Sequence, residues 1–424
     1  MTKIAVIGLG YVGLPLAHAL SACFPVIGFD VSKNRISELV KGFDRNLEFE
    51  FDDLTNIHYT DSLSDIRDCD TFIVTVPTPI NSENKPDLSP LKSASTQISG
   101  LLKKGDLVIF ESTVYPGCTE EVCIPILEQG SGLLLNDDFY CCYSPERINP
   151  GDKINTLTSV KKIISGSNVI ALNKCSEIYS KIITAGLYEA PTIKVAEAAK
   201  VLENIQRDVN IALMNELSIV MRSMGIDTMD VISAASSKWN FANYRPGLVG
   251  GHCISVDPYY LIYKANENGI SPNLISQSRE INESMTEFIF EIIIEKFKRN
   301  NLLPSNSRIG VLGVTFKENC VDIRNSKIVD LIKKFDDSRI KCLISDPLAD
   351  PNEFRSVYGL DLIKLEELSN LDCLIISCGH SEYRGLSCQK LKSLLKDDKS
   401  FILDLKSIIS REESAQYNLE VIRI

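Results

Sequence analysis

The first thirty residues hold the pattern that most restricts how this chain can fold. An apolar run from Lys3 to Ile7 leads into the segment GLGYVG at 8–13, and a second apolar run that begins at Pro25 ends at Asp30. A strand, a glycine turn, a helix and a second strand ending in an acidic residue form the start of a dinucleotide-binding βαβ unit. The pattern therefore predicts an α/β fold with a doubly wound parallel sheet.

Each glycine of this turn has a predicted role. Gly8 permits the tight turn, Gly10 lets a pyrophosphate approach the backbone, and Gly13 lets the helix pack closely on the strand. Asp30 lies 22 residues after Gly8, where a carboxylate binds both ribose hydroxyls and repels a 2′-phosphate, so NAD is predicted rather than NADP. The predicted cofactor residues of this region are Gly8, Gly10, Tyr11, Val12, Gly13, Asp30 and Arg35.

Polar loops follow three further apolar runs, which we interpret as strands. The runs and their loops are 71–76 with PTP, 107–111 with STVYPG and 140–143 with SPER. Because ligands bind beyond the carboxyl ends of strands in an open α/β sheet, Thr113 and Glu146 are candidate site residues. Pro77, Thr78 and Thr113 are assigned to the cofactor, although ordinary turn chemistry is the alternative for the prolines.

From about Pro191 the alternation of strands and helices gives way to apolar residues at steps of three and four. This spacing predicts one long helix that reaches Met224 and stops at Gly225. Such a helix can link two α/β domains and line a dimer interface. Lys200 and Asn204 lie four residues apart and share a face, which makes them site candidates; solvated surface residues are the alternative.

The last third repeats the outline of the first. Its strand pattern, over 308–313, 341–346 and 372–377, mirrors the first three strands of the chain. The second and third glycines of the fingerprint are missing, so a second NAD is not expected there. Lys317 and Arg324 suit a diphosphate in a crevice between domains, and Arg324 is also assigned to the cofactor. The predicted domains are 1–190, binding NAD; 191–303, helical; and 304–424, Rossmann-like.

Composition excludes several classes of protein. The 45 basic and 56 acidic residues give a net charge of −11, which disfavours a general nucleic-acid binder but not a local site for an anionic substrate. Thirteen cysteines without a CxxC pair or zinc spacing favour a reducing compartment, the cytoplasm, and no metal site. The apolar start of the chain is broken by glycines and Pro15, unlike a secretory signal, and no membrane span is expected.

Cys253 is the candidate nucleophile. It lies in VGGHCISVD at 249–257, where Gly250 and Gly251 allow close approach of backbone and substrate to the sulfur. A thiolate that adds to an aldehyde forms an adduct that can release a second hydride, so a thiol beside a nicotinamide site points to aldehyde oxidation. A buried cysteine after a glycine turn is the alternative.

The ordered motifs together resemble one family, the nucleotide-sugar 6-dehydrogenases that act on UDP-glucose and UDP-N-acetylhexosamines. The matching segments are GLGYVGLP at 8–15, VPTP at 76–79, STVYPG at 112–117, SPER at 144–147, the Lys200/Asn204 helix, GGHC at 250–253 and GVTFK at 313–317. The resemblance covers nearly the whole chain. It implies that NAD oxidises the C6 hydroxymethyl of a UDP-sugar twice, and that the middle helices assemble a homodimer or a larger oligomer.

The resemblance also implies roles for single residues. Cys253 captures the C6 aldehyde, Lys200 and Asn204 polarise the C6 oxygen, and Thr113 orients a water or a sugar hydroxyl. Asp257 and Glu146 are alternative bases for the water that cleaves the thioester. His252 is left as a packing or tuning residue. The predicted substrate residues are Glu146, Arg147, Lys200, Asn204, Arg245, Gly250, Phe316 and Lys317; for Arg245 a surface salt bridge is the alternative.

The segment KWNFANYRPG at 238–247, together with His252, resembles the UDP-N-acetylglucosamine 6-dehydrogenase branch. UDP-N-acetylglucosamine is therefore the first choice of substrate, with the galactosamine and mannosamine epimers left open, and the product would feed acidic surface polysaccharides. UDP-glucose oxidation is the alternative activity. A hydroxyacid dehydrogenase that does not need Cys253, and a non-catalytic NAD-binding redox sensor, are the competing classes.

Overall fold

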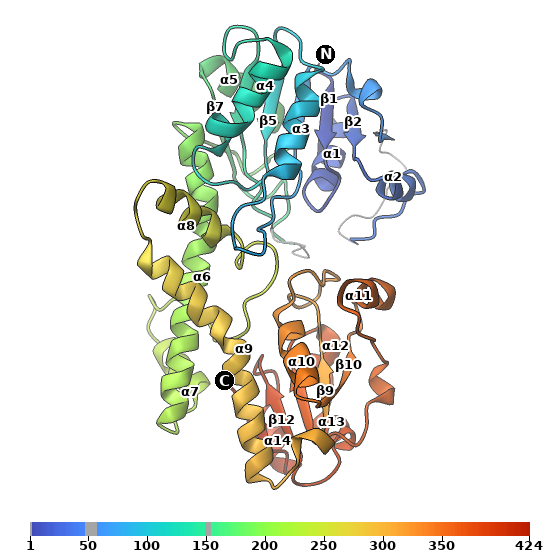
Figure 1. The fold of residues 1–424 in the computed structure, drawn as a ribbon, viewed down its shortest axis with the longest axis vertical. Coiled ribbons are helices and arrows are strands. Elements are labelled where there is room, and N and C mark those ends of the chain that lie inside the picture. Colours follow the sequence, from blue (N-terminus) through green and yellow to red (C-terminus); the bar gives the residue numbers. More distant parts are fainter. Residues whose placement is uncertain (1, 47–56, 149–153) are drawn as a thin grey trace. The chain divides into compact units, whose positions relative to one another are not determined.

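A computed structural model describes residues 2–46, 57–148 and 154–424 (Figure 1). The chain divides into two compact units. Unit 1 comprises Met1–Asn204 with Val256–Ser271, and unit 2 comprises Ile205–Ser255 with Pro272–Ile424. In the part of the chain that is described, no helix combines the length and the apolar content that a membrane crossing requires.

Unit 1 is built on an eight-stranded sheet with the order β3-β2-β1-β4-β5-β6-β7-β8. The order 3-2-1-4-5-6 of its first six strands is that of a dinucleotide-binding fold. Neighbouring strands run parallel except β6 and β7, which pair antiparallel. The strands are β1 (Ile4–Ile7), β2 (Val26–Phe29), β3 (His58–Thr60), β4 (Thr71–Val74), β5 (Leu107–Phe110), β6 (Tyr140–Tyr143), β7 (Lys162–Gly166) and β8 (Leu187–Glu189).

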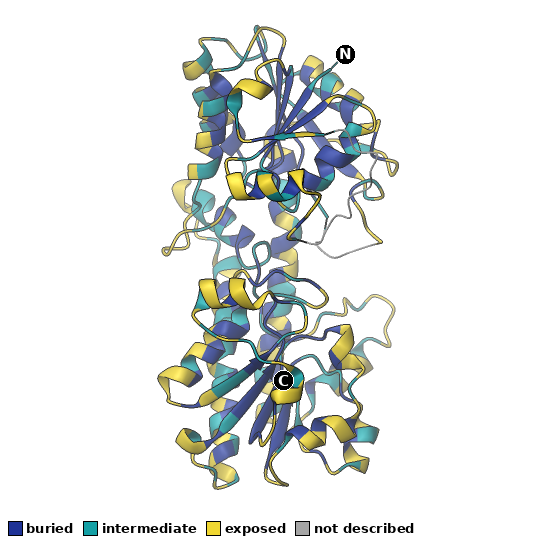
Figure 2. Cartoon of the chain, turned by 90° about the vertical axis from the view of Figure 1, so that its right-hand side faces the viewer, coloured by how far each residue is buried: buried dark blue, intermediate teal, exposed yellow. Residues whose placement is uncertain are grey.

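Helices alternate with these strands, as the sequence predicts. They are α1 (Gly13–Ser21), α2 (Lys33–Val40), α3 (Ser89–Ser99), α4 (Ile124–Ser131), α5 (Val169–Tyr179) and α8 (Asp257–Glu267). Short helical turns cover Leu63–Ile66 and Thr119–Cys123 in unit 1, and Pro304–Asn306 and Leu365–Glu367 in unit 2. The central strands β1, β4 and β5 are buried along their whole length (Figure 2), because helices cover a parallel sheet on both faces.

Unit 2 contains a five-stranded parallel sheet with the order β10-β9-β11-β12-β13. Its strands are β9 (Arg308–Leu312), β10 (Lys341–Ser345), β11 (Cys373–Ile376), β12 (Phe401–Asp404) and β13 (Val421–Ile422). Its helices are α7 (Thr228–Ala235), α9 (Asn273–Arg299), α10 (Lys327–Asp337), α11 (Pro351–Tyr358), α12 (Ser381–Arg384), α13 (Cys388–Leu394) and α14 (Arg411–Gln416).

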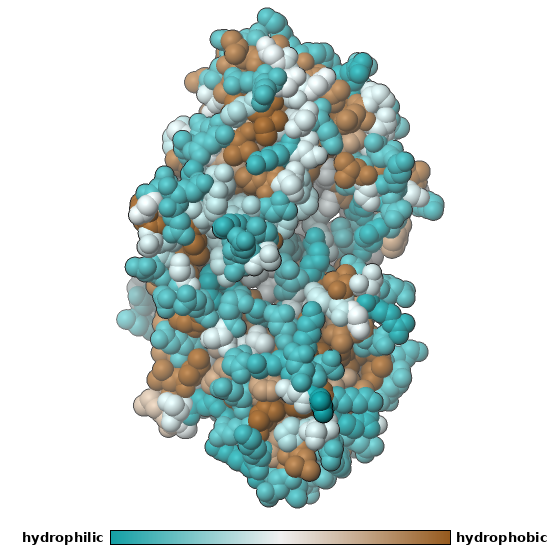
Figure 3. All heavy atoms as spheres, in the orientation of Figure 1, coloured by the Kyte–Doolittle hydropathy of each residue, from teal (hydrophilic) through white to brown (hydrophobic). Residues whose placement is uncertain are grey.

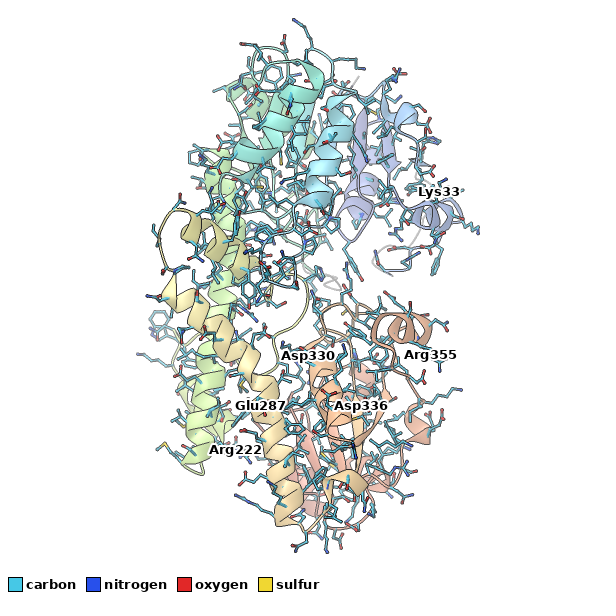
Figure 4. The ribbon with its side chains drawn as sticks, viewed as in Figure 1. Lys33, Arg222, Glu287, Asp330, Asp336 and Arg355 are labelled. Carbon is cyan, nitrogen blue, oxygen red and sulfur yellow. The ribbon has the colours of Figure 1, made fainter. Side chains whose placement is uncertain are left out.

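The side chains of this second sheet alternate between two apolar cores. Along β11, Cys373 and Ile375 join the core that contains α9 and α10, whereas Leu374 and Ile376 join the core that contains α13. This alternation follows from the two-residue repeat of a strand. Charged pairs also join α10 to α9, where Lys334 pairs with Glu287. Figure 4 labels Glu287 on α9. The visible surface is mainly hydrophilic, with scattered apolar patches (Figure 3).

The predicted fold class is confirmed, with small shifts at the ends of elements. The long helix α6 runs from Ile193 to Ser223. It begins two residues after the predicted start at Pro191 and ends one residue before the predicted end at Met224. Several strands are shorter than their apolar runs; the run 71–76, for example, forms β4 only as far as Val74. The last residues of such runs leave the sheet to begin the loops at its carboxyl edge.

Both sheets repeat the same turn after their first strand, as the mirrored sequence pattern predicts. Gly8 and Gly313 have φ angles of 93° and 94°, which glycine adopts readily. The next amide donates to the aspartate that follows the second strand: Leu9 N to Asp30 Oδ2 at 2.9 Å, and Val314 N to Asp346 Oδ2 at 2.6 Å. In unit 2 the His380 ring also lies on Asp346, with 3.3 Å between Nε2 and Oδ2.

The glycine turn of unit 1 yields a matched pair of variants. A Cβ at residue 13 would lie 1.9 Å from Gly8 O, whereas a Cβ at residue 10 would have no atom within 4 Å. We expect Gly13→Ala to lose about 1–3 kcal/mol of stability or more through overpacking. Gly10→Ala should unfold like the wild type while binding NAD more weakly. Thermal unfolding with and without NAD measures both, and equal melting temperatures would contradict this packing.

Candidate functional site

The turn after β1 has the features of a dinucleotide site. Gly10 is exposed beside open space, and no side chain caps the N-terminus of α1 at Val12, so this end of the helix has room for a phosphate. The amide of Leu14 is already used, because it donates to Gly10 O at 3.2 Å. Tyr11, which lies between Gly10 and Val12 in the sequence, is half-buried. Arg35 is buried, and its Nε donates to Leu9 O at 2.8 Å while Nη2 contacts Asp44 at 2.7 Å. Arg35 thus supports the turn, and its contact with the cofactor stays a prediction.

The loops that follow β4 and β5 lie together, as their predicted place at one sheet edge requires. Thr78 Oγ1 donates to Thr113 O at 2.7 Å, and Ser112 Oγ donates to Val76 O at 2.7 Å. Pro77 is exposed in the first of these loops. Tyr260 of α8 donates to Thr78 O at 2.9 Å, so α8, which begins at Asp257, is also hydrogen-bonded to this edge. Sequence reasoning missed Tyr260.

Glu197, another residue that sequence reasoning missed, attaches α6 to the same edge. Its buried carboxylate accepts hydrogen bonds from Gly117 N at 2.5 Å and Thr119 N at 2.9 Å. Burial raises the pKa of Glu197 to about 7. Its place three residues before Lys200, on the same helix face, is the signal that would have indicated a link between the helix and the STVYPG loop.

The candidate residues Lys200, Asn204 and Asp257 come together in unit 1. Asn204 Nδ2 donates to Asp257 Oδ2 at 2.6 Å, and the carboxylate is almost fully buried at the start of α8. Burial raises the pKa of Asp257 to about 6, against the opposing effects of the Lys200 charge and the Asn204 hydrogen bond. Asp257 is therefore a carboxylate that can accept a proton near neutral pH.

Glu146 lies in a different environment, a buried charge cluster at the edge of the same sheet. Lys162 Nζ lies 2.9 Å from Glu146 Oε2 and 2.7 Å from Glu111 Oε2, and Tyr179 donates to Glu111. The other oxygen of Glu146 accepts from the backbone amides of Arg147 and Ile148, at 2.6 and 2.8 Å. Both oxygens of Glu146 are thus occupied, which anchors the loop after β6.

The electrostatics of this cluster favour charge on the lysine. Burial by itself lowers the pKa of Lys162, but the neighbouring Glu111 and Glu146 hold it above its ordinary value. Burial raises the pKa of Glu111. Sequence reasoning missed Glu111, Lys162 and Tyr179, because each lies in or beside an apolar run. Arg147 pairs with Glu203 of α6, and its contact with a substrate stays a prediction.

The segment that carries Cys253 belongs to unit 2, where its glycines pack against residues 316–325. A Cβ on Gly250 would lie 2.5 Å from Asn325 O, and one on Gly251 would lie 2.7 Å from the Phe316 ring. The adjacent His252 ring packs edge-on against Phe316, with 5.5 Å between centroids, and lies 3.6 Å from Asp322. Cys253 is half-buried. The glycines therefore permit a close approach of two loops.

The basic residues predicted to hold the nucleotide differ in their surroundings. Arg324 forms a two-pronged pair with Asp322, with Nη2 and Oδ2 2.6 Å apart. Lys317 Nζ lies 5.8 Å from the centroid of the Phe316 ring. Arg245 is exposed, and within the described ranges no ion pair forms at this residue, so the alternative of a surface salt bridge is not observed. The ligand contacts of all three residues stay predictions.

Comparisons with solved structures agree with this architecture. A UDP-D-ManNAc dehydrogenase from Pyrococcus horikoshii superposes with a TM-score of 0.90 at 30% identity, covering 100% of this chain and 99% of that one. The UDP-N-acetyl-mannosamine dehydrogenase Cap5O from Staphylococcus aureus gives a TM-score of 0.84 at 28% identity, covering 100% and 98%.

Relatives with similar sequences extend over the same length. A UDP-N-acetyl-D-glucosamine 6-dehydrogenase from Salmonella typhi is 48% identical over 415 residues, 97% of each chain. One of the same name from Pseudomonas aeruginosa is 45% identical, covering 97% of this chain and 98% of that one, and protein CapL of Staphylococcus aureus is 46% identical over 97% of each.

Three domains of one family match the chain in order. Residues 2–183 match the NAD binding domain, 194–284 the central domain and 310–411 the UDP binding domain of the UDP-glucose/GDP-mannose dehydrogenase family. These matches confirm the resemblance that the motifs indicate and the predicted cofactor, NAD. The chain belongs to the UDP-glucose/GDP-mannose dehydrogenase family and is an NAD-dependent dehydrogenase.

Proposed function

We propose that this protein oxidises the C6 hydroxymethyl of UDP-N-acetylglucosamine in two steps to the carboxylate. The observation that carries the choice of sugar is a difference in similarity. The relatives named for the glucosamine sugar are 45% and 48% identical, whereas three archaeal relatives named for the mannosamine sugar are 31% or 32% identical. The KWNFANYRPG segment and His252 support the same branch. Similarity to CapL supports a role in acidic surface polysaccharide synthesis.

In the first oxidation, the C6 hydroxymethyl loses a proton from its oxygen and a hydride from its carbon and becomes an aldehyde. NAD, when bound at the turn after β1, supplies the acceptor for the hydride in both oxidations. Lys200 and Asn204 polarise the C6 oxygen, since an ammonium and an amide stabilise the negative charge that develops there. Thr113, in the loop that Thr78 contacts, orients the sugar or a water.

In the second oxidation, the thiol of Cys253 adds to the aldehyde carbon and its proton passes to the oxygen. Loss of a hydride and a proton from this thiohemiacetal leaves a thioester on Cys253. Water then adds to the thioester carbonyl, the C–S bond breaks, and the carboxylate leaves with the thiol restored. The overall reaction consumes one water and two equivalents of NAD for each sugar.

Asp257 is our choice of base for the water. Its pKa of about 6 lets it accept a proton at neutral pH, and its only described side-chain hydrogen bond is the one from Asn204. Glu146 has both oxygens occupied by Lys162 and two backbone amides, so it is less able to take a proton from water. Glu146 therefore acts as an anchor for the loop that carries Arg147.

The chain is proposed to work as a homodimer with three domains, as its motifs predict. The three matched family ranges support the division at about 190 and 303. The dimer surface is a stripe of exposed apolar residues at steps of four, three and four, consisting of Leu213, Leu217 and Val220 on α6 and Met224, which directly follows the helix. Thirteen cysteines without a CxxC pair support a reducing compartment, the cytoplasm.

The yield of NADH tests the proposed function directly. With UDP-N-acetylglucosamine limiting and NAD in excess, we expect two NADH per sugar, because a four-electron oxidation fixes this ratio independently of rate. Cys253→Ala should form no more than one. A wild-type yield of one would remove the thioester route, and no NADH would direct the search to UDP-glucose, to the other epimers and then to a redox sensor.

The pH profile tests the role of Asp257. We expect kcat to fall as the pH drops through about 6, because the carboxylate accepts protons only when ionised and burial places its pKa there. Asp257→Asn keeps the size and a hydrogen bond to Asn204 but should lower kcat by roughly 10²–10⁴-fold. An acid limb near pH 4, or an Asp257→Asn variant with wild-type kcat, would exclude this assignment.

Light scattering after size-exclusion chromatography tests the dimer. Leu217→Glu places a charge in the apolar stripe of α6, and we expect the mass to fall from twice 47.1 kDa to that of one chain. An exposed apolar residue outside the stripe, Val357→Glu on α11, serves as the control and should leave the dimer intact. A monomeric wild type would contradict the proposal.

A further inference from the structure

Unit 2 contains a buried network of polar side chains between α6 and α9. Arg279 Nη1 donates to Asp208 Oδ1 at 2.6 Å, and Asn282 Nδ2 donates to the same oxygen at 2.7 Å. Asn215 Nδ2 in turn donates to Asn282 Oδ1 at 2.8 Å. All four residues are at most 1% exposed. Burying a polar group away from water is unfavourable unless it is hydrogen-bonded, so this network holds its members in place.

The network of buried side chains ends at the backbone of Gly247. Gly247 N donates to Asn215 Oδ1 at 2.7 Å, and Asn215 Nδ2 donates to Gly247 O at 3.1 Å. Residues 241–250 contain no helix or strand. The amide of Asn215 therefore takes the place of a neighbouring strand, since it pairs with both the donor and the acceptor of one residue.

A second attachment lies four residues further along. Gly251 N donates to Asn325 O at 3.0 Å, and the Cα of Gly250 is too close to that oxygen to carry a side chain. The backbone from Gly247 to Gly251 is thus fixed at both ends. Cys253 follows two residues later, so the side chain of Asn215 restricts where its sulfur can lie.

We propose that Asn215 is a positioning residue for Cys253, which makes capture of the aldehyde faster than its release. This inference rests on the proposed function. The step is the addition of the thiol to the aldehyde: the C–S bond forms, the C=O π bond opens, and the thiol proton goes to the oxygen. No oxidant is consumed. Capture depends on the sulfur being close to the carbonyl carbon, and a misplacement of about 1 Å costs up to about 10²-fold in rate.

A purely structural role for the buried network predicts that its two asparagines are equivalent. If the network only packs α6 against α9, then Asn215 and Asn282 are equivalent, because each is fully buried and hydrogen-bonded to the other. Of the two asparagines, it is Asn215 that forms the described hydrogen bonds to the loop before Cys253. Asn282→Ala leaves both hydrogen bonds between Asn215 and Gly247 possible, which makes it the matched control.

The experiment uses the full-length protein with semicarbazide, which traps free aldehyde, and counts NADH per limiting UDP-N-acetylglucosamine. We expect the wild type and Asn282→Ala to stay near two NADH per sugar. Asn215→Ala should fall toward one, with UDP-sugar semicarbazone, identified by mass, making up the difference. The initial rate of the first oxidation should change by less than about threefold, because that step does not use the thiol.

The outcomes separate the two hypotheses. A yield near two for Asn215→Ala, or an equal fall for both variants at equal losses of melting temperature, overturns the positioning role. If Asn215→Ala does not fold, Asn215→Leu, which fills the same volume without hydrogen-bonding groups, makes the same comparison. A wild-type yield near one overturns the proposed function itself, and the inference with it.

Discussion

The register of one helix, α6, places four buried polar side chains against their partners. Glu197, Asn204, Asp208 and Asn215 are spaced seven, four and seven residues apart, which at 3.6 residues per turn places them on one narrow face. All four are buried. Each bonds a different partner: the STVYPG loop, Asp257, Arg279 and the backbone of Gly247. A rotation of the helix would break every one of these contacts together.

This polar face carries a desolvation cost that its hydrogen bonds offset. Taking a carboxylate or an amide out of water is unfavourable unless each group is paired. Glu197 has two backbone amides, Asp208 has Arg279 and Asn282, and Asp257 has Asn204 with Lys200 nearby. Burial nevertheless has the largest effect at all three carboxylates and raises the pKa of each. The pKa reaches about 7 at Glu197 and about 6 at Asp257, which leaves these two groups able to bind a proton near neutral pH.

Motifs that depend on local backbone geometry were predicted well from the sequence. The GLGYVG turn, its repeat at Gly313 and the parallel pairing of β1 with β2 all follow from spacing that a βαβ unit requires. The side chains missed are those whose partners are distant in sequence. Lys162 begins β7 and meets Glu111, 51 residues away, and Tyr260 meets Thr78, 182 residues away. No periodicity within either segment marks such a pair.

The sequence by itself determined the fold class and the cofactor, NAD, and supplied the candidate residues, because glycine positions and apolar spacing act over a few residues of backbone. Only the tertiary structure decided how the two candidate carboxylates differ. Glu146 is committed to Lys162 and two amides, whereas Asp257 is buried with one side-chain partner. Desolvation and pairing depend on segments that the fold brings together, and a residue's own neighbours in sequence do not specify them.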